Sequence, residues 1–231
     1  MKKKRFLIIG AHRKIKTGKS STNRIGEKNR SMSMGFDELY QALTGEPEDA
    51  PFHFRAHSKT ARPDDPPRFP GVCRLEHDDS HFYASALLRT ENPWNKAVKD
   101  NDFTWQLGDT LELFIQLKGH EDYYEFHSTP EGIRFQYHIP DYQILTKLSH
   151  EVKCCEAGLT LFNELHPEKQ VWYSVMTIPF AGIHADRPDC RFMFSRYNYS
   201  DFPGGGPELS SWPFNPDGFH TPFNWLDYPA S

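Results

Sequence analysis

Hydrophobic and polar residues alternate along residues 103–137 in a way that is typical of β-strands. In TLELFIQL, at 110–117, leucine or isoleucine fills alternate positions, and Glu112, Phe114 and Gln116 lie between them. Successive side chains of a strand point to opposite faces of its sheet. The segment therefore predicts a strand with one apolar face and one face of mixed chemistry.

A second alternating segment, GIRFQYHI at 132–139, follows DYYEFHS at 122–128 after the turn sequence Thr-Pro-Glu-Gly. Its isoleucine, phenylalanine and tyrosine side chains fall on one side, and Arg134 falls on the other. We expect Arg134 to share one face of the sheet with Glu112, among amide and aromatic groups.

Further alternating runs bounded by turn residues cover most of the remaining chain. They lie at 71–77, 81–89, 152–165, 170–180 and 190–199. So many short strands predict an all-β fold, a single β-sandwich of two mainly antiparallel sheets, immunoglobulin-like or jelly-roll-like. Short helical insertions are expected at 35–45 and 140–150, where the pattern is helical or mixed.

The composition divides the chain into three parts. Residues 1–34 form a basic tail that we expect to be disordered, 35–70 an irregular wrapping segment with a short helix, and 71–231 the sandwich. Residues 1–35 hold 11 Lys and Arg and one acidic residue, which leaves the remainder with 16 basic and 30 acidic residues. An acidic folded part argues against a nucleic-acid-binding surface.

The start of the chain matches an export signal only in part. Its apolar core runs from Phe6 to Ile9, shorter than the about 7–15 residues of a signal peptide. No run reaches the roughly 20 apolar residues of a membrane span. The sequence as given favours the cytoplasm, no membrane span is expected, and nothing in the pattern sets the oligomeric state.

The four cysteines, at positions 73, 154, 155 and 190, lack the spacing of a metal site. Free cysteine is among the most buried residue types, so we expect reduced, partly buried thiols. A disulfide between Cys73 and Cys190 is the alternative.

Several motifs follow one another in a fixed order. GDTLELFIQ is followed by YYEFHSTPEG, by IPF at 178–180, by RFMFSR at 191–196, and by a closing LSSW and FHTP. In this order, over roughly residues 80–228, they resemble the family 9 carbohydrate-binding modules. The resemblance implies a β-sandwich that binds an oligosaccharide or polysaccharide chain without cleaving it, outside the cytoplasm, often beside calcium ions and attached to glycoside hydrolases.

The same resemblance implies the residues of the binding site. In such modules two tryptophans sandwich a sugar while a glutamate and an arginine hydrogen-bond its hydroxyl groups. Here Glu112 and Arg134 match the charged pair. The aromatic pair is best matched by Trp105 and Trp212, with Trp225 competing for the second position.

Elementary chemistry supports a site of this kind. The C–H faces of a pyranose stack on aromatic rings, and its hydroxyl groups both donate and accept hydrogen bonds. Hydrogen bonds to charged groups contribute about 1.5–3 kcal/mol each, against association costs of several kcal/mol, which predicts micromolar to millimolar affinity. The plain alternative is that Glu112 and Arg134 form a cross-strand salt bridge worth about 0–1 kcal/mol and that Trp105 is a core residue.

Calcium is the cofactor that the sequence leaves open. Oxygen-rich turns contain Asp78 and Asp79 in one place and Asp100, Asp102 and Asp109 in another. Oxygen ligands suit calcium, but turn aspartates are more often hydrogen-bond caps.

Two other functions stay open beside carbohydrate binding. A glycoside hydrolase needs two facing carboxylates, and Glu112 with Glu125 on a neighbouring strand is the available pair. A haem-binding redox domain needs axial histidine or methionine ligands. Its candidate ligands are Met176, Met193, His127 and His138.

Overall fold

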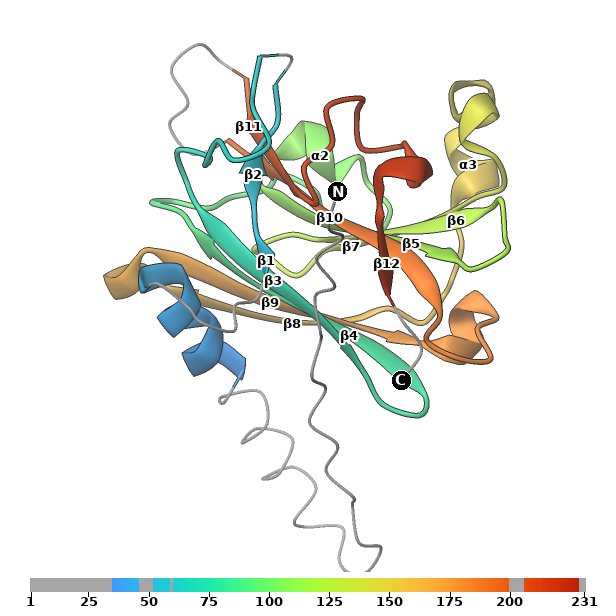
Figure 1. The fold of residues 1–231 in the computed structure, drawn as a ribbon, viewed down its shortest axis with the longest axis horizontal. Helices are drawn as coiled ribbons and strands as arrows, with labels where there is room; N and C mark the ends of the chain where they lie inside the picture. The colour runs from blue at the N-terminus through green and yellow to red at the C-terminus, as the bar shows by residue number, and fades with distance from the viewer. Residues whose placement is uncertain (1–34, 46–51, 59, 200–205, 229–231) are drawn as a thin grey trace, which may run out of the picture.

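The computed structural model describes residues 35–45, 52–58, 60–199 and 206–228, which form two antiparallel sheets packed face to face (Figure 1). The expected all-β sandwich is confirmed. The basic tail at 1–34 lies outside the described residues. Within them, none of the helices has the length and apolar character required to cross a bilayer.

The first sheet has five strands. Their order across the sheet is β1 (Phe52–His53), β3 (Gly71–His77), β4 (His81–Arg89), β9 (Val171–Pro179) and β8 (Thr160–His166). A helix at residues 35–44 packs Leu39 and Ala42 against the outer side of this sheet, where they meet Val72 and Tyr173. The helix expected at this position is therefore confirmed.

The second sheet has seven strands. Six follow in the order β2 (Arg55–Ala56), β11 (Glu208–Trp212), β10 (Cys190–Asn198), β5 (Thr110–Leu117), β6 (Tyr123–Ser128) and β7 (Arg134–Ile139), and β12 (Leu226–Tyr228) pairs with β10. Since β1 belongs to the first sheet and β2 to the second, the segment before residue 70 connects the two sheets at their edges.

Short helices lie in the connections between strands. They are α2 (Thr104–Leu107), η1 (Tyr142–Lys147), α3 (His150–Lys153), η2 (Pro167–Lys169), η3 (Phe180–Ile183) and η4 (Pro222–Asn224). The helical turns expected at 140–150 are present as η1 and the start of α3. Asp141 caps η1 by accepting a hydrogen bond from the backbone N–H of Gln143, and Ser149 caps α3 in the same way through Val152.

The space between the sheets is filled by apolar side chains. Leu111, Leu113 and Ile115 of β5 are fully buried there, together with Trp172 of β9. The alternation in TLELFIQL thus produces the apolar face that the sequence predicts. Cys73 and Cys190 also lie in this core as free thiols, and all four cysteines are free, as expected.

The opposite, outer face of the second sheet is covered as well. Phe114, Tyr123 and Phe135 form a second apolar cluster there with Phe219 and Trp225 from the coil that follows β11. In Figure 1, α2, α3 and this red coil all lie on the same side of the second sheet. Loops therefore cover the outer face of the second sheet, and polar side chains on this face are shielded from water.

Strand register corrects the expected pairing of Glu112 with Arg134. Glu112 lies opposite His127 on β6, and His127 lies opposite Phe135 on β7. Residues opposite one another in an antiparallel pair share a face, so Glu112 is on the outer face with Phe135. Arg134, one position away, is on the inner face. The predicted alternation within each strand is confirmed. Which residues of two neighbouring strands point to the same face depends on the pairing register, which the alternation does not determine.

Candidate functional site

Glu112 is the centre of a buried polar cluster on the outer face of the second sheet. Its side chain is 3% exposed, and one carboxylate oxygen accepts a hydrogen bond from the hydroxyl of Ser195, the residue opposite it on β10. The other oxygen, Oε1, lies 3.3 Å from Nε2 of His127. Two neighbouring strands therefore fix both oxygens of one carboxylate.

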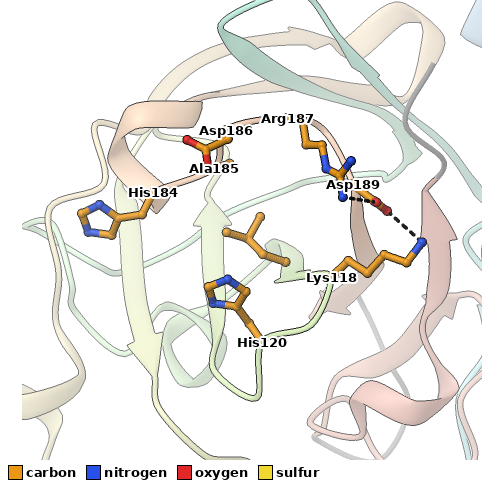
Figure 2. A pocket seen from close by; sticks show the side chains of 8 residues that line it. Lys118, His120, His184, Ala185, Asp186, Arg187 and Asp189 are labelled. Atoms are coloured by element: carbon orange, nitrogen blue, oxygen red, sulfur yellow. Dashed lines mark ion pairs between the residues drawn. The ribbon is translucent and has the colours of Figure 1, made fainter.

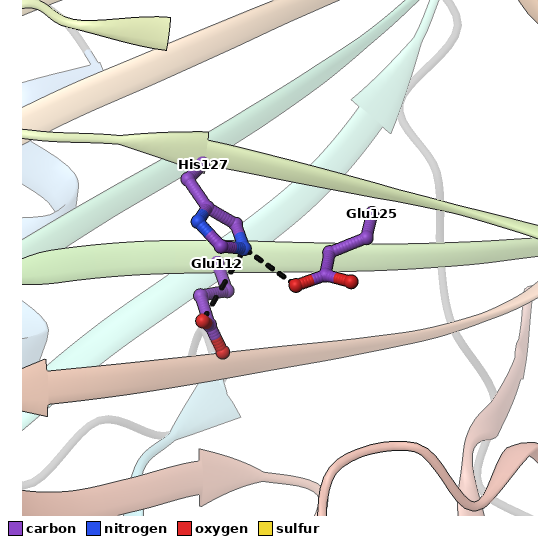
Figure 3. Close-up of side chains that lie close together, drawn as sticks. All are labelled: Glu112, Glu125 and His127. Carbon is purple, nitrogen blue, oxygen red and sulfur yellow. Dashed lines mark hydrogen bonds and ion pairs between the residues drawn. The ribbon is translucent and has the colours of Figure 1, made fainter. Parts of the chain in front are cut away.

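His127 connects this carboxylate to a second one (Figure 3). Its Nε2 lies 2.7 Å from Oε1 of Glu125, the residue two positions earlier on the same face of β6. Its Nδ1 lies 2.7 Å from the hydroxyl oxygen of Thr104, the first residue of α2. The imidazole stacks on Phe135 with ring centroids 4.2 Å apart. Polar contacts therefore fix both ring nitrogens of His127, and stacking on Phe135 fixes the plane of the ring.

Burial dominates the protonation states of this cluster. It raises the pKa of Glu112 to about 7 and also raises the pKa of Glu125. It lowers the pKa of His127 to about 4. Burial in an apolar medium penalises the charged form of each group. Near neutral pH the imidazole is therefore uncharged, and the carboxyl group of Glu112 is partly protonated.

The cluster borders a pocket of about 170 Å³. Both carboxylates line it, and so do the rings of Phe103, Trp105 and Tyr137. Trp105 projects from α2, is half-buried, and meets His127 edge-on at 5.7 Å between centroids. Lys153, Tyr197 and His220 are among its other polar lining residues. Aromatic walls with a few convergent polar groups are typical of small-molecule sites.

A second pocket, of about 130 Å³, has a different character (Figure 2). It lies beside the β5–β6 turn, where Asp189 meets Lys118 and Arg187 at 3.4 Å each. Both cations are 71% exposed, and exposed ion pairs of this kind are worth about 0–1 kcal/mol. Its lining residues include no aromatic ring except imidazoles and no buried carboxylate. The pocket beside Glu112 is the stronger candidate site.

Trp105 and Glu112 are the two expected site residues that the structure brings together. Trp225 lies in the same outer cluster, but it is 5% exposed and packs against Phe114 and Tyr123. Its indole N–H donates to the carbonyl oxygen of Phe219 at 3.0 Å. Trp225 thus closes the coil over the sheet and does not line the pocket.

Arg134 and Trp212 lie away from the pocket. Arg134 forms an ion pair with Asp100 and donates to the carbonyl oxygen of Leu159. Trp212 pairs with Phe194 on β10 and stacks on Phe52, so it faces the core between the sheets. Placing both residues beside Glu112 was wrong, because the register turns both side chains to the inner face.

The aspartates considered for calcium are engaged with the protein. Asp78, Asp102 and Asp109 each accept hydrogen bonds from two backbone N–H groups. Asp100 pairs with an arginine, and Asp79 is exposed. Capping roles therefore account for three of these five carboxylates, and calcium at these turns stays a prediction.

The four candidate haem ligands do not gather at one place. Met176 is buried between the sheets, and Met193 is in the outer cluster. His127 is held by carboxylates, and His138 lies 2.6 Å from Asp122 near the surface. The structure therefore gives a haem-binding function no support.

Glu125 and His127 enter the sequence-based predictions only through the two rival functions, and Thr104 and Ser195 do not enter them. The spacing Glu-x-His in YYEFHS was an available signal, because residues two apart on a strand share a face. The contribution of α2 and β10 depends on tertiary packing and had no local signal.

No protein-family model and no curated protein matches the chain in sequence. Among solved structures, a protein from Bacteroides uniformis ATCC 8492 provisionally assigned as carbohydrate-binding superimposes with a TM-score of 0.57 at 16% identity. The match covers 86% of this chain and 89% of that one. It shows that the two chains share a fold.

Two structures of a family 9 carbohydrate-binding module from Caldicellulosiruptor kristjanssonii are also similar, each at 11% identity over 73% of this chain. The complex with cellotriose has a TM-score of 0.44 and covers 73% of the module, and the complex with glucose has 0.46 and 74%. Likenesses below 0.5 establish no relationship in function. The class that fold and site define is thus a β-sandwich with a pocket of aromatic rings and carboxylates on the outer face of its larger sheet.

Proposed function

We propose that this protein binds a carbohydrate without cleaving it, in the pocket beside Glu112. The observation that carries the proposal is the meeting of Trp105 with two buried carboxylates in one pocket. An indole ring offers a stacking surface to the C–H face of a pyranose, and carboxylate oxygens accept hydrogen bonds from its hydroxyl groups.

The size of the pocket favours one sugar unit, such as the end of a chain. Pockets for drug-sized ligands measure about 300–1,000 Å³, whereas this one measures about 170 Å³. The oxygens of Glu112 already meet Ser195 and His127, but a carboxylate oxygen has two lone pairs and can accept a further hydrogen bond. Few strong contacts imply a Kd in the micromolar to millimolar range.

The fold gives independent but weaker support. The Bacteroides protein of the same fold is assigned as carbohydrate-binding, and a shared fold alone does not fix a function. Carbohydrate binding of this kind also favours a location outside the cytoplasm. The proposal rests on the site residues and their chemistry, and the shared fold is consistent with it.

The test is a calorimetric titration of the full chain with mono- and oligosaccharides, with and without calcium. We expect saturable, weak binding of at least one sugar, and at least about tenfold weaker binding, or 1.4 kcal/mol, for Glu112→Gln and Trp105→Ala. Arg134→Ala is the matched control, because it removes a charged side chain from the inner face. Equal losses in all three variants, or no binding sugar in the panel, would overturn the proposal.

A glycoside hydrolase is the second candidate, and one observation favours it. Glu112 and Glu125 line one pocket, their nearest ligand oxygens lie within 4.8 Å, and burial raises the pKa of Glu112 to about 7, as a general acid requires. Against it, His127 occupies the space between the carboxylates, where hydrolysis requires the scissile bond. Release of reducing sugar by the wild type, abolished in Glu125→Gln, would establish the enzyme.

A further inference from the structure

Three side chains of the outer cluster have the composition of a metal site. Nε2 of His127 and one carboxylate oxygen each from Glu112 and Glu125 lie within 4.8 Å of one another, and all three residues are at least 96% buried. Ligands at about 2.0–2.2 Å from a tetrahedral zinc ion lie about 3.3–3.6 Å apart. The 3.3 Å between Nε2 and Glu112 Oε1 fits this spacing. The 2.7 Å to Glu125 requires that carboxylate to move outward by less than 1 Å.

The atoms behind these ligands are already held. Thr104 hydrogen-bonds Nδ1 of His127, which fixes the ring and leaves Nε2 for an ion. Ser195 donates to the second oxygen of Glu112, which leaves Oε1. Such outer hydrogen bonds orient metal ligands and are worth about 10–100-fold in metal affinity. Because three of these four residues are on strands, the arrangement has a rigid support.

A buried oxygen without a partner is an independent observation that points to a ligand. Oε2 of Glu125 is buried and has no hydrogen-bond partner, in a side chain that is 4% exposed and lines the pocket. Among the described residues, no lysine or arginine forms an ion pair with Glu112 or Glu125. In their ionised forms these two buried carboxylates would have no ion-paired cation, and an unpaired buried charge is costly, so a bound divalent ion would stabilise them.

We infer that Glu112, Glu125 and His127 bind one divalent transition-metal ion of the zinc class. One imidazole nitrogen and two carboxylate oxygens suit zinc, whereas calcium takes six to eight oxygen ligands. The pocket borders both carboxylates, so the fourth coordination position is open to water or to a ligand. The site shares Glu112 with the proposed sugar pocket but does not depend on sugar binding.

The experiment uses the full chain, stripped with a chelator and titrated with Zn²⁺ alone by calorimetry, with the metal content of untreated protein measured by mass spectrometry. We expect one equivalent of Zn²⁺ to bind to the wild type. The nearly isosteric Glu125→Gln should weaken binding at least about a hundredfold, and His127→Gln likewise. The matched control His120→Gln removes an exposed histidine that stands beside an acid, Asp122, and should bind like the wild type.

A positioning variant keeps the test informative if a ligand variant fails to fold. Thr104→Val removes only the hydroxyl that holds Nδ1 of His127, and about 10–100-fold weaker Zn²⁺ binding is expected. Binding of no Zn²⁺ by the wild type, or equal binding by Thr104→Val, Glu125→Gln and the wild type, would overturn the inference. Since no sugar is present, failure here leaves the carbohydrate proposal standing, and failure of sugar binding leaves the metal site standing.

Discussion

Both faces of the second sheet are buried at strand β5, but they differ in chemistry. On the inner face of β5, Leu111, Leu113 and Ile115 are 0% exposed, and on its outer face Glu112 and Phe114 are 3% and 1% exposed. The inner face stabilises the fold through apolar contact. The outer face buries two carboxylates. An apolar side chain such as leucine at these positions would avoid the desolvation cost of a buried charge and could leave the fold more stable. The proposed binding function would account for this difference, since groups that weaken a fold persist where function needs them.

The inner face should show the largest effect on stability. Leu113→Ala removes a fully buried side chain between the sheets, and such changes cost about 2–5 kcal/mol because a cavity remains. Urea denaturation should show the midpoint falling by the corresponding amount, while sugar and Zn²⁺ affinities of the folded protein stay unchanged. Leu165→Ala, at a leucine that is 46% exposed, is the control and should change the free energy of unfolding by about 0.5 kcal/mol or less.

The outer face should instead change how stability depends on pH. In chelator, Glu112 keeps its proton in the folded state up to about pH 7, whereas the unfolded chain releases it near 4.5. The folded state therefore binds more protons between these values, so Glu112 contributes stability at low pH that is lost as pH rises to about 7. The stability of Glu112→Gln relative to the wild type should rise by about 3 kcal/mol over this range.

His127 should contribute with the opposite sign. Its folded pKa is about 4 against an ordinary 6.5, so between these values the unfolded chain binds the extra proton and stability rises with pH. His127→Gln should lose this rise, and its stability relative to the wild type should fall by about 3 kcal/mol from pH 4 to 6.5. Denaturant midpoints measured across this range check both signs. Parallel curves for the two variants and the wild type would contradict the buried cluster.

A variant of Arg196 tests whether a buried charged residue on the inner face of the second sheet contributes to the proposed sugar site. Arg196 lies two positions after Phe194, on the same inner face of β10, and is 1% exposed. Its guanidinium group donates hydrogen bonds to the backbone carbonyl oxygens of Phe69 at 2.9 Å and Arg89 at 2.6 Å. Arg196→Lys keeps the charge but cannot serve both carbonyls from one fork. We expect a loss of about 1–3 kcal/mol in the free energy of unfolding, with sugar affinity unchanged. Weaker sugar binding by the folded variant would place Arg196 in the site.

The sequence was sufficient for the class of fold and for the role of each face within a strand. Period-two alternation around Leu113 predicted the core, and turn residues marked the strand ends. The pairing register between neighbouring strands could not be predicted from the sequence. A shift of one residue in this register exchanges the two faces of a strand, and such a shift places Glu112 and Arg134 on opposite faces. The covering of the outer face by α2 and the coil with Trp225 depends on contacts distant in sequence, which local patterns do not encode.

The smallest effect is expected for Arg134, and it sharpens the comparison of the two faces most directly. Its ion pair with Asp100 joins side chains that are 35% and 41% exposed, so Arg134→Ala should cost about 0–1 kcal/mol in the free energy of unfolding. Calorimetry should give it the sugar affinity of the wild type, while Trp105→Ala loses at least about tenfold. Arg134 and Glu112 are separated by one position in register, so any loss of affinity in Arg134→Ala would show that binding extends to the inner face. An unchanged affinity would confine the site to the outer face, where an aromatic ring and two carboxylates share one pocket.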